Sequence, residues 1–317
     1  MDPLVKDLVE VLDLETLEMN LFRGPSRDLG GRSTYGGQII GQAMVAASRT
    51  VEDRDPHSLH AYFLLPGDMN LPVVYEVDRS RDGGSFSSRR VQAIQHGRPI
   101  LSMMASFQKP ETGFEHQAVM PKVPPPEALR PWHEMVPEWI ATEPGITEEA
   151  VNALSADFFI EFRPVDPVNP LQPVKRATRG AMWFRAKAKL PDDPALHRCV
   201  LAYASDWGLL GAALRPYGRR WFERDMIVAS IDHALWFHRD ARADEWLLYV
   251  TDSHAAQSAR GLSRGMIFDT SGRLIASSAQ EGLMRCVEER EHWERTITLD
   301  EEDEEVHAGA PGANKPS

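Results

Sequence analysis

The sequence predicts an α+β fold in which two similar halves each wrap an antiparallel sheet around one helix of small residues. Three observations predict it. The same order of elements occurs twice along the chain, each expected central helix is rich in glycine and alanine, and proline-rich sequence separates the two copies. The chain has 317 residues, of which 42% are hydrophobic, which is enough for two domains with substantial cores.

The first half begins with an expected helix at 35–48 (YGGQIIGQAMVAAS). An aromatic strand follows at 59–65, and residues 72–108 alternate like strands and turns. Each glycine inside a helix costs about 1 kcal/mol of helix stability relative to alanine. Small side chains are therefore expected to have a packing purpose, because they let a helix lie close to a sheet.

The second half repeats this order. A strand-like segment begins at Gly180, a helix is expected at 204–216 (ASDWGLLGAALRP), a strand at 229–239, and further strands and turns at 246–285. The turns QHGRPI and TSGRLI lie at matching places, offset by 175 residues. Such self-similarity indicates duplication. A small-residue helix embraced by a curved antiparallel sheet is the hotdog fold, and two copies in one chain make a double hotdog.

Proline marks the connector between the halves, at 110–131 and again at 162–176. Proline cannot continue a helix or a central strand, and one short amphipathic helix is expected between these segments, at 138–156. The expected organisation has four parts, namely an N-terminal hotdog domain at 1–110, a connector at 111–177, a C-terminal hotdog domain at 178–287, and a tail at 288–317. The tail contains six consecutive acids, Asp300–Glu305, and this composition predicts disorder.

Composition argues against several classes of partner. The net charge of −12 is unfavourable for binding nucleic acid or an anionic membrane surface. Cys199 and Cys286 lie far apart and form no CxxC pair, so neither a disulfide framework nor a zinc site is expected. No apolar run approaches the length of a membrane span, the N-terminus does not resemble a signal peptide, and the C-terminus lacks the SKL signal. A cytoplasmic protein is the simplest expectation.

Asp206 is the most unusual residue, because it lies between an apolar run and a small-residue stretch. A carboxylate beside a core needs partners that offset its lost hydration. Two explanations are open: Asp206 caps the N-terminus of the following helix, or it takes part in catalysis. The two roles are compatible.

Several motifs resemble the acyl-CoA thioesterase II family: YGGQIIGQA, HSLHAYFLLPGD, GGSFSSRRVQAIQHGRPI, ASDWGLL, SIDHALWFHR and ARGLSRGMIFDTSGRLIASSAQEGLMR. The resemblance extends over residues 10–286. It implies the double hotdog fold and hydrolysis of acyl-CoA to a fatty acid and coenzyme A. It also implies that neither a metal or other cofactor nor a covalent acyl-enzyme is used.

The resemblance implies a catalytic set of Asp206, Ser230 and Gln280. Members of the family carry Thr or Ser at the hydroxyl position, and Ser230 lacks the methyl group that restricts a Thr rotamer. A thioester is electrophilic enough to be attacked by a held water, for which Asp206 would serve as general base. The Gln280 amide and the Ser230 hydroxyl can both donate and accept hydrogen bonds, and so would fix that water.

Substrate contacts are expected from Gly37, His60, Arg89 and Arg264. Glycine at a helix start lets a substrate approach the backbone N–H groups that stabilise an oxyanion. Arginine recognises phosphates such as those of coenzyme A, although exposed arginines paired with surface acids are an alternative. His60 is expected either to form hydrogen bonds in the core or to line an acyl-CoA groove.

Three other interpretations compete. GLSRG at 261–265 fits the nucleophile elbow of serine hydrolases, but Ser263 is followed by strand-like sequence rather than a helix. A hydratase would need a His beside a carboxylate at the buried helix start, and neither expected small-residue helix carries one. A duplicated hotdog could also bind acyl-CoA without hydrolysing it. By analogy with paired hotdogs, a homodimer or homotetramer is expected.

Overall fold

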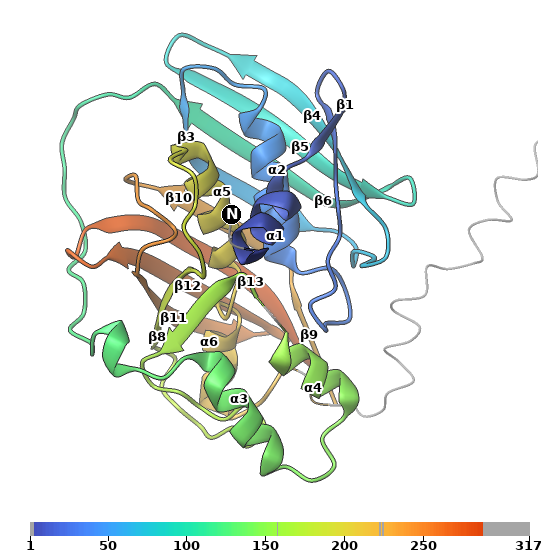
Figure 1. Cartoon of the computed structure of the whole chain (residues 1–317), viewed down its shortest axis with the longest axis vertical. Helices are drawn as coiled ribbons and strands as arrows, with labels where there is room; N and C mark the ends of the chain where they lie inside the picture. The colour runs from blue at the N-terminus through green and yellow to red at the C-terminus, as the bar shows by residue number, and fades with distance from the viewer. Residues whose placement is uncertain (1–2, 157, 222, 224, 288–317) are drawn as a thin grey trace, which may run out of the picture.

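The computed structural model describes residues 3–156, 158–221, 223 and 225–287 (Figure 1). The acidic run at Asp300–Glu305 lies outside the described residues. Within the described part of the chain, no helix is both long and apolar enough to cross a membrane.

The first half has the predicted order of one central helix followed by antiparallel strands. Its central helix, α2, lies within the predicted segment, and most of its residues are buried. Between the last two strands, His96 and Gly97 adopt left-handed φ angles of 49° and 68°, as a tight hairpin turn requires. The elements are α1 (Pro3–Leu12), β1 (Glu15–Glu18), β2 (Leu21–Gly24), α2 (Gly36–Ser48), β3 (Asp55–Phe63), β4 (Val73–Asp82), β5 (Phe86–Gln95) and β6 (Arg98–Gln108).

The second half repeats this arrangement. Its last three strands form a meander like that of β4 to β6. The elements are β7 (Ile160–Pro164), β8 (Gly180–Ala186), α5 (Pro194–Ser205), α6 (Gly211–Leu214), η2 (Arg215–Tyr217), β9 (Met226–Ser230), β10 (Asp232–Phe237), β11 (Leu247–Gln257), β12 (Arg260–Asp269) and β13 (Leu274–Cys286).

One antiparallel sheet runs through both halves, in the order β1-β2-β4-β5-β6-β3-β10-β13-β12-β11-β8-β7, with β9 also paired to β13. The halves meet where β3 pairs with β10, from Asp232 opposite Tyr62 to Trp236 opposite Ser58. The sheet curves around α2 and α5 (Figure 1). This architecture confirms the predicted α+β fold with two sheet-wrapped helices.

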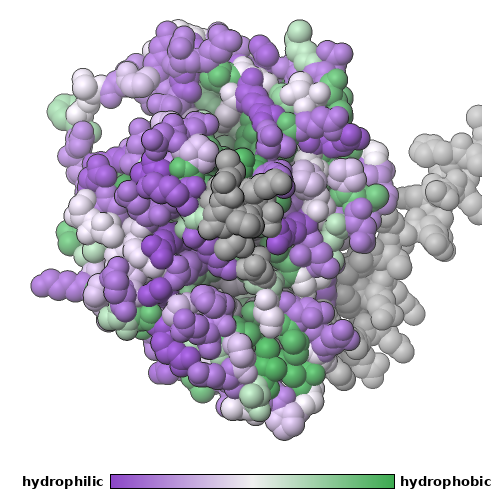
Figure 2. Space-filling view, in the orientation of Figure 1, coloured by the Kyte–Doolittle hydropathy of each residue, from purple (hydrophilic) through white to green (hydrophobic). Residues whose placement is uncertain are grey.

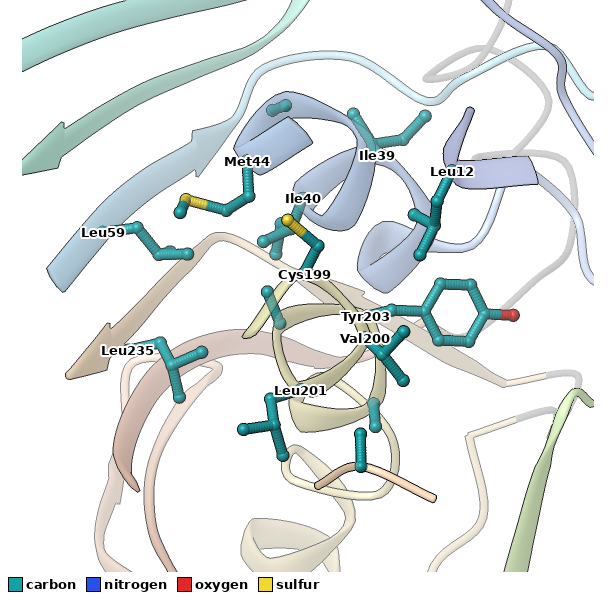
Figure 3. Packing of buried hydrophobic residues seen from close by; sticks show 14 of the residues in the cluster. Leu12, Ile39, Ile40, Met44, Leu59, Cys199, Val200, Leu201, Tyr203 and Leu235 are labelled. Atoms are coloured by element: carbon teal, nitrogen blue, oxygen red, sulfur yellow. The ribbon is translucent and has the colours of Figure 1, made fainter. Parts of the chain in front are cut away.

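The two central helices pack against each other in antiparallel directions. Gly37 lies against Tyr203 and Gly41 against Cys199, so the start of α2 adjoins the end of α5. A Cβ atom on Gly37 would lie 2.2 Å from the Tyr203 carbonyl oxygen. The same helices fill the core with Ile40, Met44, Val200 and Leu201 (Figure 3). The small residues of α2 therefore serve helix-to-helix packing, and not only the helix-to-sheet packing expected from the sequence.

The second central helix is α5, at Pro194–Ser205, and the prediction that it spans 204–216 is wrong. Asp193 caps its N-terminus by accepting from the Ala195 N–H at 2.9 Å, and Pro194 occupies the first turn. After Ser205 the chain turns through Gly208 at φ 73°. Within the predicted segment, only the last two residues of α5 and the short helix Gly211–Leu214 are α-helical.

A polar interruption explains why sequence periodicity missed α5. His197 and Arg198 are both buried within it. The Arg198 guanidinium forms ion pairs with Asp55, at 2.6 Å, and with Asp240. Because the polar residues of α5 are buried and paired, α5 has no solvent-facing polar side. Its sequence therefore lacks the alternation of polar and apolar residues, at 3.6 residues per turn, that marks an amphipathic helix.

The connector contains η1 (Pro126–Ala128), α3 (Trp132–Ala141) and α4 (Glu148–Ser155). The single expected helix at 138–156 is wrong, because Gly145 at φ 98° separates α3 from α4. Residues upstream of α3 pack on Trp183 and Phe268, on the sheet face opposite α5. The face shown in Figure 2 is mainly hydrophilic, and its hydrophobic residues gather low in the view, where the connector helices lie.

Candidate active site

Asp206 closes the C-terminal end of α5, with φ −78° and ψ −19°, and is half-buried. The interpretation of Asp206 as an N-cap is therefore wrong. A carboxylate at a helix C-terminus faces the negative end of the helix dipole. Its charge must be offset by groups outside α5.

Gln280 supplies one such group. Its side-chain nitrogen, from the buried face of β13, donates to Asp206 Oδ1 at 2.6 Å and to Ser230 Oγ at 2.8 Å. Ser230 is the last residue of β9 and pairs with Gly282. Because Gln280 uses both of its N–H bonds, the Ser230 hydroxyl keeps its own hydrogen for another acceptor. The structure thus brings all three predicted catalytic residues into one hydrogen-bonded cluster.

The N-terminus of α2 supplies the second group. A Cβ atom on Gly36 would lie 2.8 Å from Asp206 Oδ2, so the first turn of α2 touches the carboxylate. The first N–H groups of a helix have no acceptor within the helix, and its dipole is positive there. The site is therefore composite: the first half contributes a helix start and the second half contributes the carboxylate.

Tyr35 links the start of α2 to the end of α5 by a hydrogen bond. Its hydroxyl donates to the Tyr203 carbonyl oxygen at 2.9 Å. Burial, reinforced by the nearby Asp206 carboxylate, raises the pKa of the Tyr35 phenol well above its usual value. The phenol consequently stays protonated and remains a donor.

An aromatic cluster encloses one side of the site. Trp207 stacks on Phe162 at 5.0 Å between ring centroids, and its ring lies 4.1 Å from that of Phe158 and 6.5 Å from that of Tyr35. Sequence analysis did not identify these residues as part of the site. Phe158 and Phe162 come from the segment assigned to the connector. The only sequence signal for a buried strand there was the group of aromatic and apolar residues at 158–160 and 162.

A buried imidazole lies behind Asp206. His233 Nε2 is 2.9 Å from Ser205 Oγ, and the His233 side chain is fully buried. Burial lowers the pKa of His233, although the Asp206 and Asp232 carboxylates oppose this shift. His233 is therefore neutral near pH 7.

Acidification is expected to destabilise the protein below about pH 6.5, because burial lowers the pKa of several folded imidazoles from their ordinary value of 6.5. The unfolded chain then binds protons that the folded chain excludes, so the free energy of unfolding falls as the pH drops. Urea unfolding at pH 7.5, 6.5 and 5.5 measures this. The residues concerned are His57, His197 and His233.

One substitution sharpens the measurement. His233→Gln removes a fully buried imidazole and should flatten the pH dependence of the free energy of unfolding. Stability that is constant or rises on acidification would contradict the expectation.

The four predicted substrate contacts have different surroundings. Gly37 lies beside the cluster, at the start of α2. His60 is exposed on the outer face of β3, with its ring 5.2 Å from that of Trp236. Arg264 is exposed on β12, with a guanidinium nitrogen 2.6 Å from His254 Nε2.

Arg89 is buried, with 2% of its surface exposed. Its guanidinium donates to Thr50 Oγ1, the Thr50, Arg81 and Ser88 carbonyl oxygens, and Asp82 Oδ1. These bonds use all five N–H groups. The arrangement leaves no donor for a phosphate, and Arg89 instead anchors β5 to the end of α2.

Two alternative chemistries can be compared with the structure. Ser263 lies in the middle of β12 rather than on a turn between strand and helix, so GLSRG is not a nucleophile elbow. The two segments expected as central helices contain no histidine, but the observed central helix α5 contains His197. His197 is buried near the start of α5, where its Nδ1 accepts from the Ala243 N–H at 3.0 Å, and Asp206 lies at the opposite end of the helix.

The described residues offer no candidate metal site. No group of three or more His, Cys, Asp or Glu side chains among them is placed to hold a metal ion.

Both halves of the chain match models of known protein families. Residues 25–108 match the family model of the acyl-CoA thioesterase N-terminal domain, and residues 153–283 match the acyl-CoA thioesterase model. Acyl-CoA thioesterase 2 of Haemophilus influenzae is 40% identical over 289 residues, which cover 91% of this chain and 100% of that protein.

Solved structures similar to this chain lead to the same family and fold. The crystal structure of an acyl-CoA thioesterase II, TesB2, from Mycobacterium marinum is 42% identical with a TM-score of 0.71, and the match covers 89% of this chain and 99% of that one. A protein from Alicyclobacillus acidocaldarius described as having a hot dog fold has a TM-score of 0.69 at 18% identity, covering 88% of this chain and 98% of that one, which supports the fold alone. The chain is therefore a double hotdog protein and belongs to the acyl-CoA thioesterase II family.

Proposed function

We propose that this protein hydrolyses acyl-CoA thioesters with a water molecule that Asp206 activates and that Ser230 and Gln280 help to hold. The observation that carries the proposal is the pair of hydrogen bonds from Gln280 to Asp206, at 2.6 Å, and to Ser230, at 2.8 Å. Gln280 holds one carboxylate oxygen, while the other faces the start of α2. A carboxylate fixed in this way can accept a proton from water as a general base.

The start of α2 supports stabilisation of the oxyanion. The backbone N–H groups of Gly36 and Gly37 belong to its first turn, where a helix has no acceptors of its own. A thioester carbonyl beside Asp206 would direct its oxygen toward these donors as negative charge develops. Glycine suits both positions, because a side chain there would meet Asp206 or Tyr203.

The reaction balances with water alone. The water oxygen bonds to the carbonyl carbon while its proton passes to Asp206. The tetrahedral intermediate then collapses, the carbon–sulfur bond breaks, and the departing sulfur takes up the proton. The products are a carboxylic acid and coenzyme A, and Asp206 is regenerated as a carboxylate.

We infer, further, that the protein is cytoplasmic and assembles as a homodimer or homotetramer. Two free cysteines fit a reducing compartment. Tyr62 and Met104, at 59% and 44% exposure, lie on the outer sheet face and would suit a contact between copies. Sedimentation velocity on the purified protein gives the number of chains in the assembly.

Release of coenzyme A from acyl-CoAs of short, medium and long chain tests the function, followed with a thiol-reactive dye. We expect turnover on at least one chain length, because both halves and the cluster are intact. Binding of the same acyl-CoAs is measured in parallel by calorimetry. Binding without thiol release on any chain would establish the non-catalytic alternative. Hydration of the double bond of an enoyl-CoA, with no release of thiol, would favour a hydratase.

A further inference from the structure

Ser263, which the catalytic cluster does not use, lies next to Gln280 inside the sheet. In the register of β12 and β13, Ser263 is directly opposite Gln280. Neighbouring strands are about 4.8 Å apart, and residues directly opposite point to the same face. Both side chains are fully buried, at 0% exposure. The hydroxyl of Ser263 therefore lies beside the amide that holds Asp206.

His233 lies on the other side of Gln280. Ala234 of β10 is opposite Ala279 of β13, and because these strands are antiparallel, the next residues along, His233 and Gln280, face each other. The His233 side chain is also 0% exposed. A row of three buried polar side chains thus crosses β10, β13 and β12 on the face that carries the site.

Each of these side chains has one buried atom without a hydrogen bond. Among the described residues, His233 Nδ1, Gln280 Oε1 and Ser263 Oγ have no hydrogen-bond partner. Buried polar atoms in folded proteins are almost always paired, with protein or with water. The three unmatched atoms belong to one row with Gln280 in its middle, so each lacks a partner that a small polar molecule beside Gln280 could supply.

The donor and acceptor roles of the three atoms follow from their other bonds. The Asp206 carboxylate only accepts, so the nitrogen of Gln280 must face it and Oε1 is left as an acceptor. Ser205 Oγ lies 3.0 Å from the Ala202 carbonyl oxygen and donates to it, and it therefore accepts from His233 Nε2–H. Neutral His233 then presents Nδ1 as a second acceptor. The Ser263 hydroxyl supplies one donor.

We propose that a buried water joins Ser263, Gln280 and His233, and that Ser263 is through it a positioning residue for Gln280. A water has two hydrogens, which match Gln280 Oε1 and His233 Nδ1, and a lone pair, which matches the Ser263 hydroxyl. Buried waters typically make about three hydrogen bonds. This arrangement prevents the Gln280 amide from rotating away from Asp206. The effect on turnover rests on the function proposed above, whereas the water site does not.

Ser263→Ala is expected to lower kcat for thiol release about threefold to tenfold, with KM little changed, because one hydrogen bond of an orienting network is lost. In a Gln280→Ala background, the same substitution should change kcat less than twofold, because no amide remains to be positioned. A double-mutant cycle measures this coupling.

Ser253→Ala is the matched control. Ser253 is opposite Ser263 on β11, but its hydroxyl is already satisfied by the Leu262 carbonyl oxygen at 2.8 Å. The Ser253→Ala substitution should therefore leave kcat unchanged. Equal losses from Ser263→Ala in both backgrounds would overturn the positioning role, and a loss as large as that of Asp206→Asn would show that Ser263 acts on the substrate directly.

A crystal structure at high resolution tests the water site independently of turnover. We expect density within hydrogen-bond distance of all three atoms in the wild type, and its loss in Ser263→Ala. A direct hydrogen bond between Ser263 and Gln280, or a dry gap between them, would overturn the proposal. If the wild type releases no thiol, the proposed function fails, and the crystal structure still decides whether the water site exists.

Discussion

Asp206→Asn is expected to lower kcat for thiol release about 10³-fold, within the range that general bases contribute. The asparagine oxygen can still accept from Gln280, whose nitrogen lies 2.6 Å from the Asp206 carboxylate, so the geometry of the cluster survives. An amide cannot take up the proton of the attacking water. The loss should therefore appear in kcat, while KM and the thermal unfolding temperature stay close to those of the wild type.

Asp53→Asn provides the control for this substitution. Asp53 is exposed and has a left-handed φ of 56°, a conformation that asparagine also adopts readily. The rate of thiol release from both variants is measured with the thiol-reactive dye over the same series of acyl-CoA concentrations. The dependence of that rate on concentration gives kcat and KM separately. A variant Asp206→Asn that retains more than a tenth of wild-type kcat would show that another group activates the water.

Gly37→Ala is expected to reduce the free energy of unfolding by about 3 kcal/mol, at the upper end of overpacking costs. The new Cβ would lie 2.2 Å from the Tyr203 carbonyl oxygen and 2.6 Å from the Tyr35 ring. A backbone oxygen cannot move aside by changing rotamer, so α2 and α5 must separate. Their separation also carries the start of α2 away from Asp206, and kcat should fall with stability.

Gly211→Ala distinguishes this clash from a general effect of adding a methyl group. Gly211 begins α6 and has no atom within 4 Å of the position that a Cβ would occupy. Alanine there should stabilise the protein slightly, because it favours helix and restricts the unfolded chain. Urea unfolding gives the free energy of unfolding of both variants. Equal values for Gly37→Ala and Gly211→Ala would refute the proposed clash.

Much of the fold follows from local sequence. Alternating strands, the turn at His96 and Gly97, and the small-residue segment of α2 are properties of short segments, and the resemblance of long motifs leads to the family. The second central helix escaped prediction for a physical reason. Arg198 is buried through ion pairs with Asp55 of β3 and with Asp240, which lies in the connection after β10. No periodicity within α5 therefore marks it as a helix.

The candidate site was predictable in its residue types but not in its construction. The motif around Asp206 does not reveal that it ends a helix, because the preceding apolar run has no polar face. The contact of Gly36 with Asp206 depends on how α2 and α5 pack, which no local pattern encodes. Arg89 illustrates the converse, since its position in a matching motif favoured a ligand role while its buried hydrogen bonds are all made within the protein.

The antiparallel pairing of α2 with α5 also determines how many sites the chain has. Pseudo-twofold symmetry would place a second site where α2 ends and α5 begins. There the residue equivalent to Asp206 is Arg49, which pairs with Asp13 at 2.6 Å, and the first residue of α5 is Pro194, which has no N–H to offer. Only one end of the helix pair therefore combines a carboxylate with facing helix N–H groups, and the proposed function predicts one site for each chain rather than two.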